Sequence, residues 1–184
     1  MLESSLKESI AALNSLTSLA TQIDAAAEAI VKSLQAGGGL YCCGNGGSAA
    51  ESQHFTTELL GRFRSNRRPL KAVSLTADPS LLTCIGNDFG WDEIFARQVQ
   101  GMCGPNDVLC VFSTSGNSPN IQAALKAART AGCKTIAVLG KSGGGAKGLA
   151  DFEVIVGSQK TGAIQEAHLF LVHYFCERIE DVFA

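Results

Sequence analysis

VLCVFSTSGNSPN, residues 108–120, passes from an apolar run into a polar turn and then into a helical pattern. The run VLCVF (108–112) is continuously apolar, as expected for a strand that is covered on both faces. The segment SPNIQAALKAARTAG (118–132) spaces its apolar residues as a helix does, with Ser118 as a candidate N-cap and Pro119 in the first turn. This stretch therefore predicts a strand, a turn and a helix in direct succession.

The same alternation continues through the rest of the chain. Further strand-type runs are LYCC, AVSL, TIAVL and FEVIV, at residues 40–43, 72–75, 135–139 and 152–156. Helical patterns occupy residues 48–60 and 162–183, and residues 2–36 are expected to form two helices that end at three consecutive glycines. Strands that alternate with helices predict an α/β fold with a mainly parallel sheet. No domain boundary is visible, so residues 1–184 are expected to form one domain, and the glycine-rich loop KSGGGAKG (141–148) is assigned no chemistry.

The composition is that of an ordinary globular chain with little net charge. Hydrophobic residues make up 46% and charged residues 17% of the 184 residues, and the formal net charge is −2. We therefore expect no nucleic-acid or membrane partner, and the densest basic stretch, RSNRR (64–68), is interpreted as a solvated loop. The seven cysteines form no C-x-x-C pair, and neither a secretory segment nor a run near the ~20 apolar residues of a membrane span is present. These features indicate a cytoplasmic protein with reduced thiols.

Two polar turns follow strands and open helices. STSGNS (113–118) is the first, and CGNGGSAAES (43–52) repeats the arrangement. The first amides of a helix lack partners and carry the positive end of its dipole, while serine hydroxyls and close-approaching glycines add to an anion site. Each turn alone is equally compatible with an ordinary helix cap, but two such turns at the carboxyl ends of parallel strands can share one crevice. Neither matches G-x-G-x-x-G or the P-loop, so a small sugar phosphate is the favoured guest and no nucleotide is expected.

The histidines and their polar neighbours form the second candidate group. His54 and Glu58 are four residues apart and share one helix face, which is compatible with a polar surface stripe, a metal-binding pair, or an acid and a base. Gln165, His168 and His173 lie on the apolar C-terminal helix, where a lone histidine is usually hydrogen-bonded in the core. Gln165 and His173 are about 12 Å apart along a helix. They could meet one ion only if it lay between them, or they serve sites in different chains.

Together these stretches resemble the sugar isomerase (SIS) domain, and within it the bacterial sedoheptulose 7-phosphate isomerases, or phosphoheptose isomerases. The resemblance covers nearly the whole chain and rests on CGNGGSA (43–49), QHFTTELLGRFR (53–64), TCIGNDFG (83–90), STSGNSPN (113–120) and IQEAHLFLVH (164–173). It implies a three-layer, flavodoxin-like parallel sheet and a homotetramer with sites between subunits. It also implies conversion of sedoheptulose 7-phosphate to D-glycero-D-manno-heptose 7-phosphate, the first step toward the nucleotide-activated heptose of lipopolysaccharide or capsule.

The resemblance also assigns residues to roles. Zinc is the implied cofactor, and the positions that match its ligands are His54, Glu58, Gln165 and His173. Glu58 and His173 match the catalytic acid–base residues. The implied substrate-binding residues are Asn45, Gly46, Gly47, Ser48, Glu58, Asn87, Asp88, Ser113, Thr114, Ser115, Ser118 and Gln165. The chain departs from many members at Ala163, where they carry Arg or Lys two residues before the glutamine of IQE.

These assignments define a mechanism. Glu58 is expected to move the carbon-bound proton, His173 to serve the sugar oxygens, and zinc to polarise the carbonyl. A carboxylate cannot be a free base and a tight zinc ligand at once, so the metal is expected to be weakly held or mobile. The helices outside the sheet are apolar enough to predict self-association, with residues 1–36 used in oligomer packing and Glu58 of one chain facing His173 of another.

Two rival functions remain compatible with the serine turns. A non-catalytic SIS module, such as a sugar-phosphate-binding protein or a replication regulator, would not need Glu58 and His173, and both are present. An amino-sugar phosphate isomerase or a sugar-phosphate sensor would fit the turns, but not IQEAHLFLVH (164–173). The acid–base pair therefore favours an isomerase.

Overall fold

The computed structural model describes all 184 residues and is organised around one parallel sheet. Its five strands lie in the order β2-β1-β3-β4-β5. They are β1 (Leu40–Gly44), β2 (Ala72–Ser74), β3 (Val108–Ser113), β4 (Lys134–Gly140) and β5 (Phe152–Val156). All four pairings are parallel. This order is that of flavodoxin-like sheets, in which β1 and β3 flank the point where the strand order reverses. The predicted fold class and all five predicted strands are confirmed.

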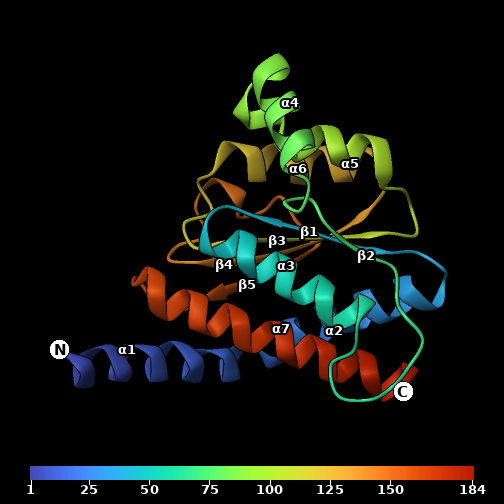
Figure 1. Cartoon of the computed structure of the whole chain (residues 1–184). Helices are drawn as coiled ribbons and strands as arrows, with labels where there is room; N and C mark the ends of the chain where they lie inside the picture. The colour runs from blue at the N-terminus through green and yellow to red at the C-terminus, as the bar shows by residue number, and fades with distance from the viewer.

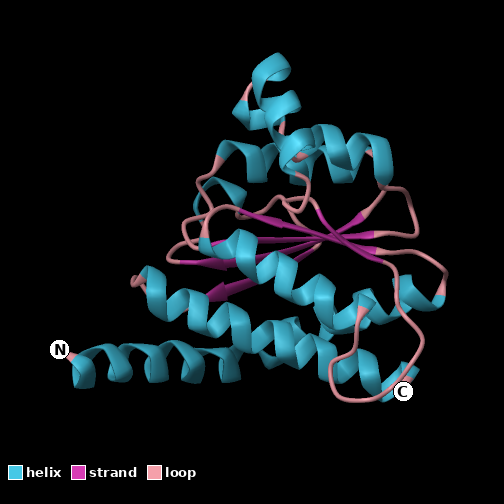
Figure 2. Cartoon of the chain, viewed as in Figure 1, coloured by secondary structure: helices cyan, strands magenta, loops and turns pink.

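Helices cover both faces of the sheet and complete the three layers (Figures 1 and 2). One face carries α1 (Leu2–Ser15), α2 (Ala20–Gln35), α3 (Gly47–Leu60) and α7 (Thr161–Phe183). The other face carries α4 (Pro79–Phe89), α5 (Ala96–Met102) and α6 (Pro119–Thr130). Three short 3₁₀ turns complete the chain: η1 (Leu16–Leu19), η2 (Trp91–Glu93) and η3 (Gly144–Ala146). None of the helices combines the length with the apolar character that crossing a membrane would require.

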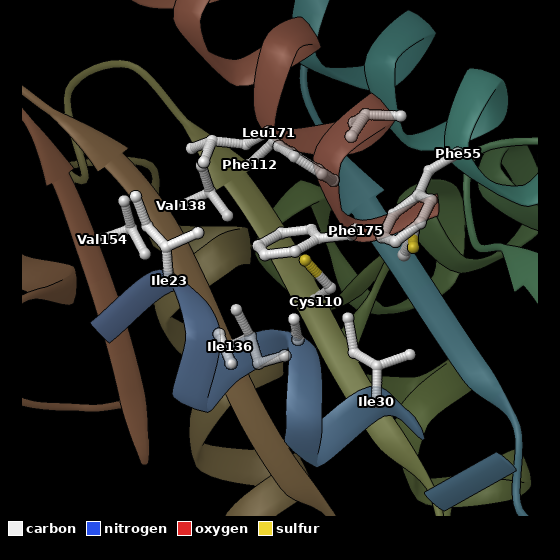
Figure 3. Close-up of a cluster of buried hydrophobic side chains, with 14 of the residues drawn as sticks. Ile23, Ile30, Phe55, Cys110, Phe112, Ile136, Val138, Val154, Leu171 and Phe175 are labelled. Atoms are coloured by element: carbon white, nitrogen blue, oxygen red, sulfur yellow. The ribbon is translucent and has the colours of Figure 1, made fainter. Parts of the chain in front are cut away.

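The strands supply side chains to both layers because successive residues point to opposite faces. In β3, Val108, Cys110 and Phe112 enter the core beneath α2, α3 and α7, whereas Leu109 and Val111 face the opposite layer. Figure 3 shows the first of these cores, in which residues of α2, α3 and α7 meet the inner strands. Burial on both faces explains why the central strands are mostly apolar, whereas the edge strands β2 and β5 carry Ser74 and Glu153.

Packing between α3 and α7 is the feature of the fold that positions the site. The two helices run side by side over the sheet (Figure 1). Phe55 of α3 and Phe175 of α7 are fully buried and stack with ring centroids 5.9 Å apart. Such a pair contributes about 0.5–1.5 kcal/mol beyond its burial. The two helices that carry the predicted acid–base residues are therefore held together by the core.

The sequence patterns did not reveal α4 and α5, which lie between β2 and β3. Asp78 is the N-cap of α4, and its carboxylate accepts hydrogen bonds from the amides of Ser80 and Leu81, with Pro79 at the first helical position. These are ordinary start signals for a helix. The apolar residues of α4 recur at helical spacing, so this helix could have been predicted, whereas α5 is only 7 residues long. The other predicted helices are confirmed, although a 3₁₀ turn joins α1 to α2.

Candidate active site

Both predicted serine turns open onto one cavity of about 200 Å³ at the carboxyl ends of β1 and β3. The first turns of α3, α6 and α7 surround it, so three helix N-termini face the same space. Its lining residues are Asn45, Ser48, Phe112, Ser113, Thr114, Ser115, Ser118, Thr161 and Gln165. Helix N-termini and hydroxyls favour an anionic guest. The prediction that the two turns share one crevice is confirmed, and Thr161 is a lining residue that the sequence reasoning missed.

Internal hydrogen bonds shape the turn after β3. The Gly116 amide donates to Ser113 Oγ at 3.1 Å, and the Asn117 amide donates to Ser115 Oγ at 3.2 Å. Ser118 occupies the N-cap of α6, but its hydroxyl makes no capping bond. The Ser118 hydroxyl is therefore available to a ligand rather than consumed by the helix.

The glycine-rich loop 141–148 supports this turn. Gly116 has a φ of +65°, and a Cβ there would lie 1.9 Å from the carbonyl oxygen of Gly143. The Ala146 amide donates to the Gly116 carbonyl at 2.9 Å. Only glycine satisfies both the left-handed backbone and the close approach. The sequence assigned this loop no chemistry, and in the structure the loop packs directly behind the serine turn.

An amide pair connects the two turns. Asn45 Nδ2 donates to Asn120 Oδ1, and Asn120 Nδ2 donates back to Asn45 Oδ1, both at 2.9 Å. Asn120 is almost fully buried in the first turn of α6. The pair fixes the orientation of the Asn45 side chain toward the cavity. Asn120 was not among the predicted site residues because its partner is 75 positions away in the chain.

Gln165 lies directly against the first turn of α3. A Cβ on Gly47 would stand 2.2 Å from Gln165 Nε2, so the absence of a side chain at this position makes room for the glutamine. Gln165 and Ser48 both line the cavity. Gly47 leaves room because it has no side chain, whereas Gly46 permits the positive φ of +59° at the N-cap of α3.

Farther along the same two helices, His54, Glu58 and His173 converge. His54 Nε2 lies 3.0 Å from Glu58 Oε1 and 3.4 Å from His173 Nε2. One donor atom from each residue falls within 4.8 Å of the others, and all three side chains are half-buried. The expectation that Glu58 and His173 face each other from different chains is wrong, because the core packing of α3 on α7 brings them together within one chain.

The donor atoms of this cluster fit a divalent cation. His54 Nε2 has two close neighbours, Glu58 Oε1 and His173 Nε2. It carries at most one proton, so it cannot hydrogen-bond to both of them at once. Two imidazole nitrogens and one carboxylate oxygen are a common zinc donor set that leaves a fourth position open. Cys176 is not among the grouped donor residues, and burial and the Glu58 carboxylate raise the pKa of its thiol well above the ordinary range.

The structure does not bring the remaining predicted residues to this cluster. Gln165 stands beside Gly47, about two helical turns and 12 Å before His173 along α7. Asn87 and Asp88 are exposed on α4, where the Asn87 amide donates to Asp88, and they do not line the cavity. Figure 1 shows α4 standing away from the sheet.

A buried pair lies between the cavity and the cluster. His168 is fully buried, and its Nε2 donates to the Leu139 carbonyl at 3.2 Å, so the expectation of a hydrogen-bonded core histidine is confirmed. Its Nδ1 lies 3.5 Å from Glu51 Oε2, and neither atom has another partner. The pair connects α7 to α3, and along α3 it lies about one helical turn from the cavity and one from the His54, Glu58 and His173 cluster.

Comparisons with known proteins agree with this arrangement. The SIS domain family matches residues 6–140, a range that contains both serine turns. The phosphoheptose isomerase of Citrifermentans bemidjiense is 49% identical over 88% of this chain and 84% of its own. The solved phosphoheptose isomerases of Francisella tularensis and Neisseria gonorrhoeae align with TM-scores of 0.94 and 0.90, at 38% and 39% identity. Each alignment covers 98% of this chain, and 96% and 97% of the respective structure. Within the SIS-domain class, this chain belongs to the phosphoheptose isomerase family.

Proposed function

We propose that this chain interconverts sedoheptulose 7-phosphate and D-glycero-D-manno-heptose 7-phosphate, the first step toward nucleotide-activated heptose. The observation that carries the proposal is the arrangement of two sites along one pair of helices. The polar cavity lies at the start of α3 and α7, and the His54, Glu58 and His173 cluster lies about two turns farther along. That spacing suits a sugar whose phosphate and reacting carbons are at opposite ends.

The cavity would hold the phosphate. The hydroxyls of Ser113, Ser115 and Ser118 and the amides of three helix N-termini supply donors without a lysine. Further contacts would come from Asn45, Gly46, Gly47, Ser48, Thr114 and Gln165. Anchoring the remote phosphate positions the reacting carbons against the acid–base residues, which lowers the entropy cost of reaching the transition state. Ala163, at the buried start of α7, provides no basic contact.

Glu58 and His173 would carry the proton transfers. Glu58 Oε1 faces His54, whereas Oε2 has no hydrogen bond and is free to take the proton from C1 of the ketose. The resulting enediol receives that proton at C2 to give the aldose. His173 would move the proton between the two sugar oxygens, acting as acid toward one and base toward the other.

Zinc is the cofactor that we propose for this site. His54, Glu58 and His173 would hold it, and when bound it supplies Lewis-acid polarisation of the sugar carbonyl. Because Glu58 serves both as ligand and as base, the ion would be weakly held. Gln165 could complete the ligand set only if the metal site included a second chain, given its position beside Gly47.

We propose a homotetramer in which substrate sites lie between subunits. Leu2, Leu6 and Ile10 of α1 and Phe170 of α7 are exposed apolar residues, which supports the burial of residues 1–36 and of α7 in an oligomer. Asn87 and Asp88 are exposed on α4 and would contact substrate in a neighbouring chain. One functional domain would cover residues 1–184, since α7 beyond the family match supplies His173. Seven unpaired cysteines support a cytoplasmic location.

Incubating the protein with sedoheptulose 7-phosphate and detecting the aldoheptose phosphate tests the proposal directly. Glu58→Gln and His173→Ala serve as catalytically impaired controls. Turnover that both controls lack would support the proposed roles. Binding of the phosphorylated sugar without turnover would instead identify a non-catalytic SIS module.

A further inference from the structure

The segment from Gly61 to Arg68, here called the 61–68 segment, crosses the end of α3 and packs against α7. The carboxylate of Glu180 on α7 accepts hydrogen bonds from the amides of Arg64 and Ser65, at 3.0 and 3.1 Å. The Arg64 guanidinium also pairs with Glu177. The segment contains RSNRR, whose interpretation as a solvated loop is therefore only partly correct. It is fixed to the helix that carries His173.

Phe63 defines the orientation of the His173 ring. The two rings stack with centroids 5.7 Å apart and an interplanar angle of 22°. On the same imidazole, His54 makes an edge contact with centroids 5.1 Å apart and an interplanar angle of 70°. The Arg64 guanidinium lies 4.8 Å from the centroid of Phe63. A ring held flat against Phe63 has little freedom to rotate, so its Nε2 stays directed at His54.

Arg67 performs a comparable task for the last turn of α3. Its Nη2 donates to the Glu58 carbonyl at 2.7 Å, and its Nη1 donates to the Leu59 carbonyl at 2.8 Å. These carbonyls belong to the final turn of the helix and have no partner within it. A guanidinium there also complements the negative end of the helix dipole. Arg67 thereby fixes the backbone of Glu58, the proposed base.

We propose that Phe63 and Arg67 are positioning residues for the isomerisation, with Phe63 acting on the His173 ring and Arg67 acting on Glu58. This inference rests on the proposed function, because it assigns the two residues to the acid–base pair of that reaction. Neither residue lines the cavity that would hold the phosphate. Their loss should therefore impair the proton-transfer step and leave the binding of the phosphorylated sugar nearly intact.

Steady-state kinetics of matched variants test the positioning of His173. Phe63→Leu keeps an apolar side chain but removes the flat ring, and it should lower kcat by about ten- to a hundred-fold with KM within about two-fold of the original. Phe63→Tyr retains the ring and should recover most of kcat. An unchanged kcat in Phe63→Leu would overturn the role of Phe63. So would a lowered kcat that is accompanied by a raised KM and a lowered Tm.

Two adjacent arginines provide a matched test for Glu58. Arg67→Met removes both hydrogen bonds and should lower kcat with little change in KM, and Arg67→Lys, which retains a charged donor, should recover part of it. Arg68→Ala is the control, because the Arg68 guanidinium lies over the Phe183 ring rather than against α3. Equal loss in the Arg67→Met and Arg68→Ala proteins would overturn the role of Arg67, and so would full activity of Arg67→Met.

A spectroscopic measurement separates this inference from the proposed reaction. The chain has three histidines, so His173→Ala identifies the His173 ring signals in an NMR spectrum of labelled protein. Stacking on Phe63 should displace those signals, and Phe63→Leu should shift them while leaving the His168 signals in place. This result does not depend on turnover. If the wild-type protein did not isomerise the heptose phosphate, the proposed function would be refuted. The NMR comparison would still test the position of the His173 ring. Unshifted His173 signals in Phe63→Leu would overturn the positioning itself.

Discussion

Replacing Gly47 by alanine should weaken catalysis while leaving the fold as stable as before or more so. The Cβ would lie 2.2 Å from Gln165 Nε2 and 2.9 Å from its Cδ, whereas ordinary contact begins at 3.4 Å. The amide end of Gln165 must therefore move by 3.4 − 2.2 = 1.2 Å. Gln165 is only half-buried, and its amide is the far end of a flexible side chain, so the backbone need not shift.

The opposing effects can be estimated from the structure. Gly47 is the first residue of α3 and has no left-handed φ, so alanine fits the backbone there, and the gain of about 0.5–1 kcal/mol known for helix interiors is an upper bound. If Gln165 binds the sugar phosphate as proposed, moving its amide away from the cavity removes that hydrogen bond, which costs about 1–3 kcal/mol. The second effect corresponds to a loss of roughly 5- to 150-fold in kcat/KM.

The assay combines isomerase kinetics with thermal unfolding. Gly101→Ala is the control, since Gly101 lies in α5 with open space around its Cβ position. We expect it to leave kcat/KM unchanged. An unchanged kcat/KM in Gly47→Ala would refute the argument that Gln165 contacts substrate from this position. A lowered Tm in the same variant would refute the claim that only the side chain moves.

Four further predictions follow from the site. Ser118→Ala and Ser115→Ala should each raise KM for the phosphorylated sugar by about ten- to a hundred-fold, as expected for a lost bond to a charged group, and Ser118→Ala should keep its Tm because Ser118 makes no capping bond. Chelation should lower activity and added zinc should restore it, measured alongside metal content; full activity without metal would remove zinc from the mechanism. Mixed oligomers of Glu58→Gln and His173→Ala chains, confirmed by mass spectrometry, should remain inactive because both residues serve one chain's cluster, and recovered activity would contradict that geometry. Ellman's reagent should modify Cys84 rapidly in the native protein and all seven cysteines in denaturant, because five of the other thiols are buried and Cys103 is half-buried; several fast thiols would count against the packed core.

The sequence by itself determined the features that depend on neighbouring residues. Mostly apolar runs identified all five strands, because a strand covered on both faces has few sites for polar side chains; Ser74 and Glu153 lie in the two edge strands, β2 and β5. Spacing of four residues placed His54 and Glu58 on one face of α3, since helix geometry requires it. The serine turns were recognised because a helix N-terminus and its cap are local structures.

Only the tertiary structure decided which of these local features meet. His173 is 119 positions from His54 in the chain, and its contact with His54 depends on the packing of α7 against α3 through Phe55 and Phe175. Because of the same packing, Glu58 and His173 meet within one chain, and the expectation that they come from different chains was wrong. Asn120 joins Asn45 for a similar reason: the sheet places the ends of β1 and β3 side by side. Distances between elements follow from how the core fills space, and no periodicity within a single element contains that information.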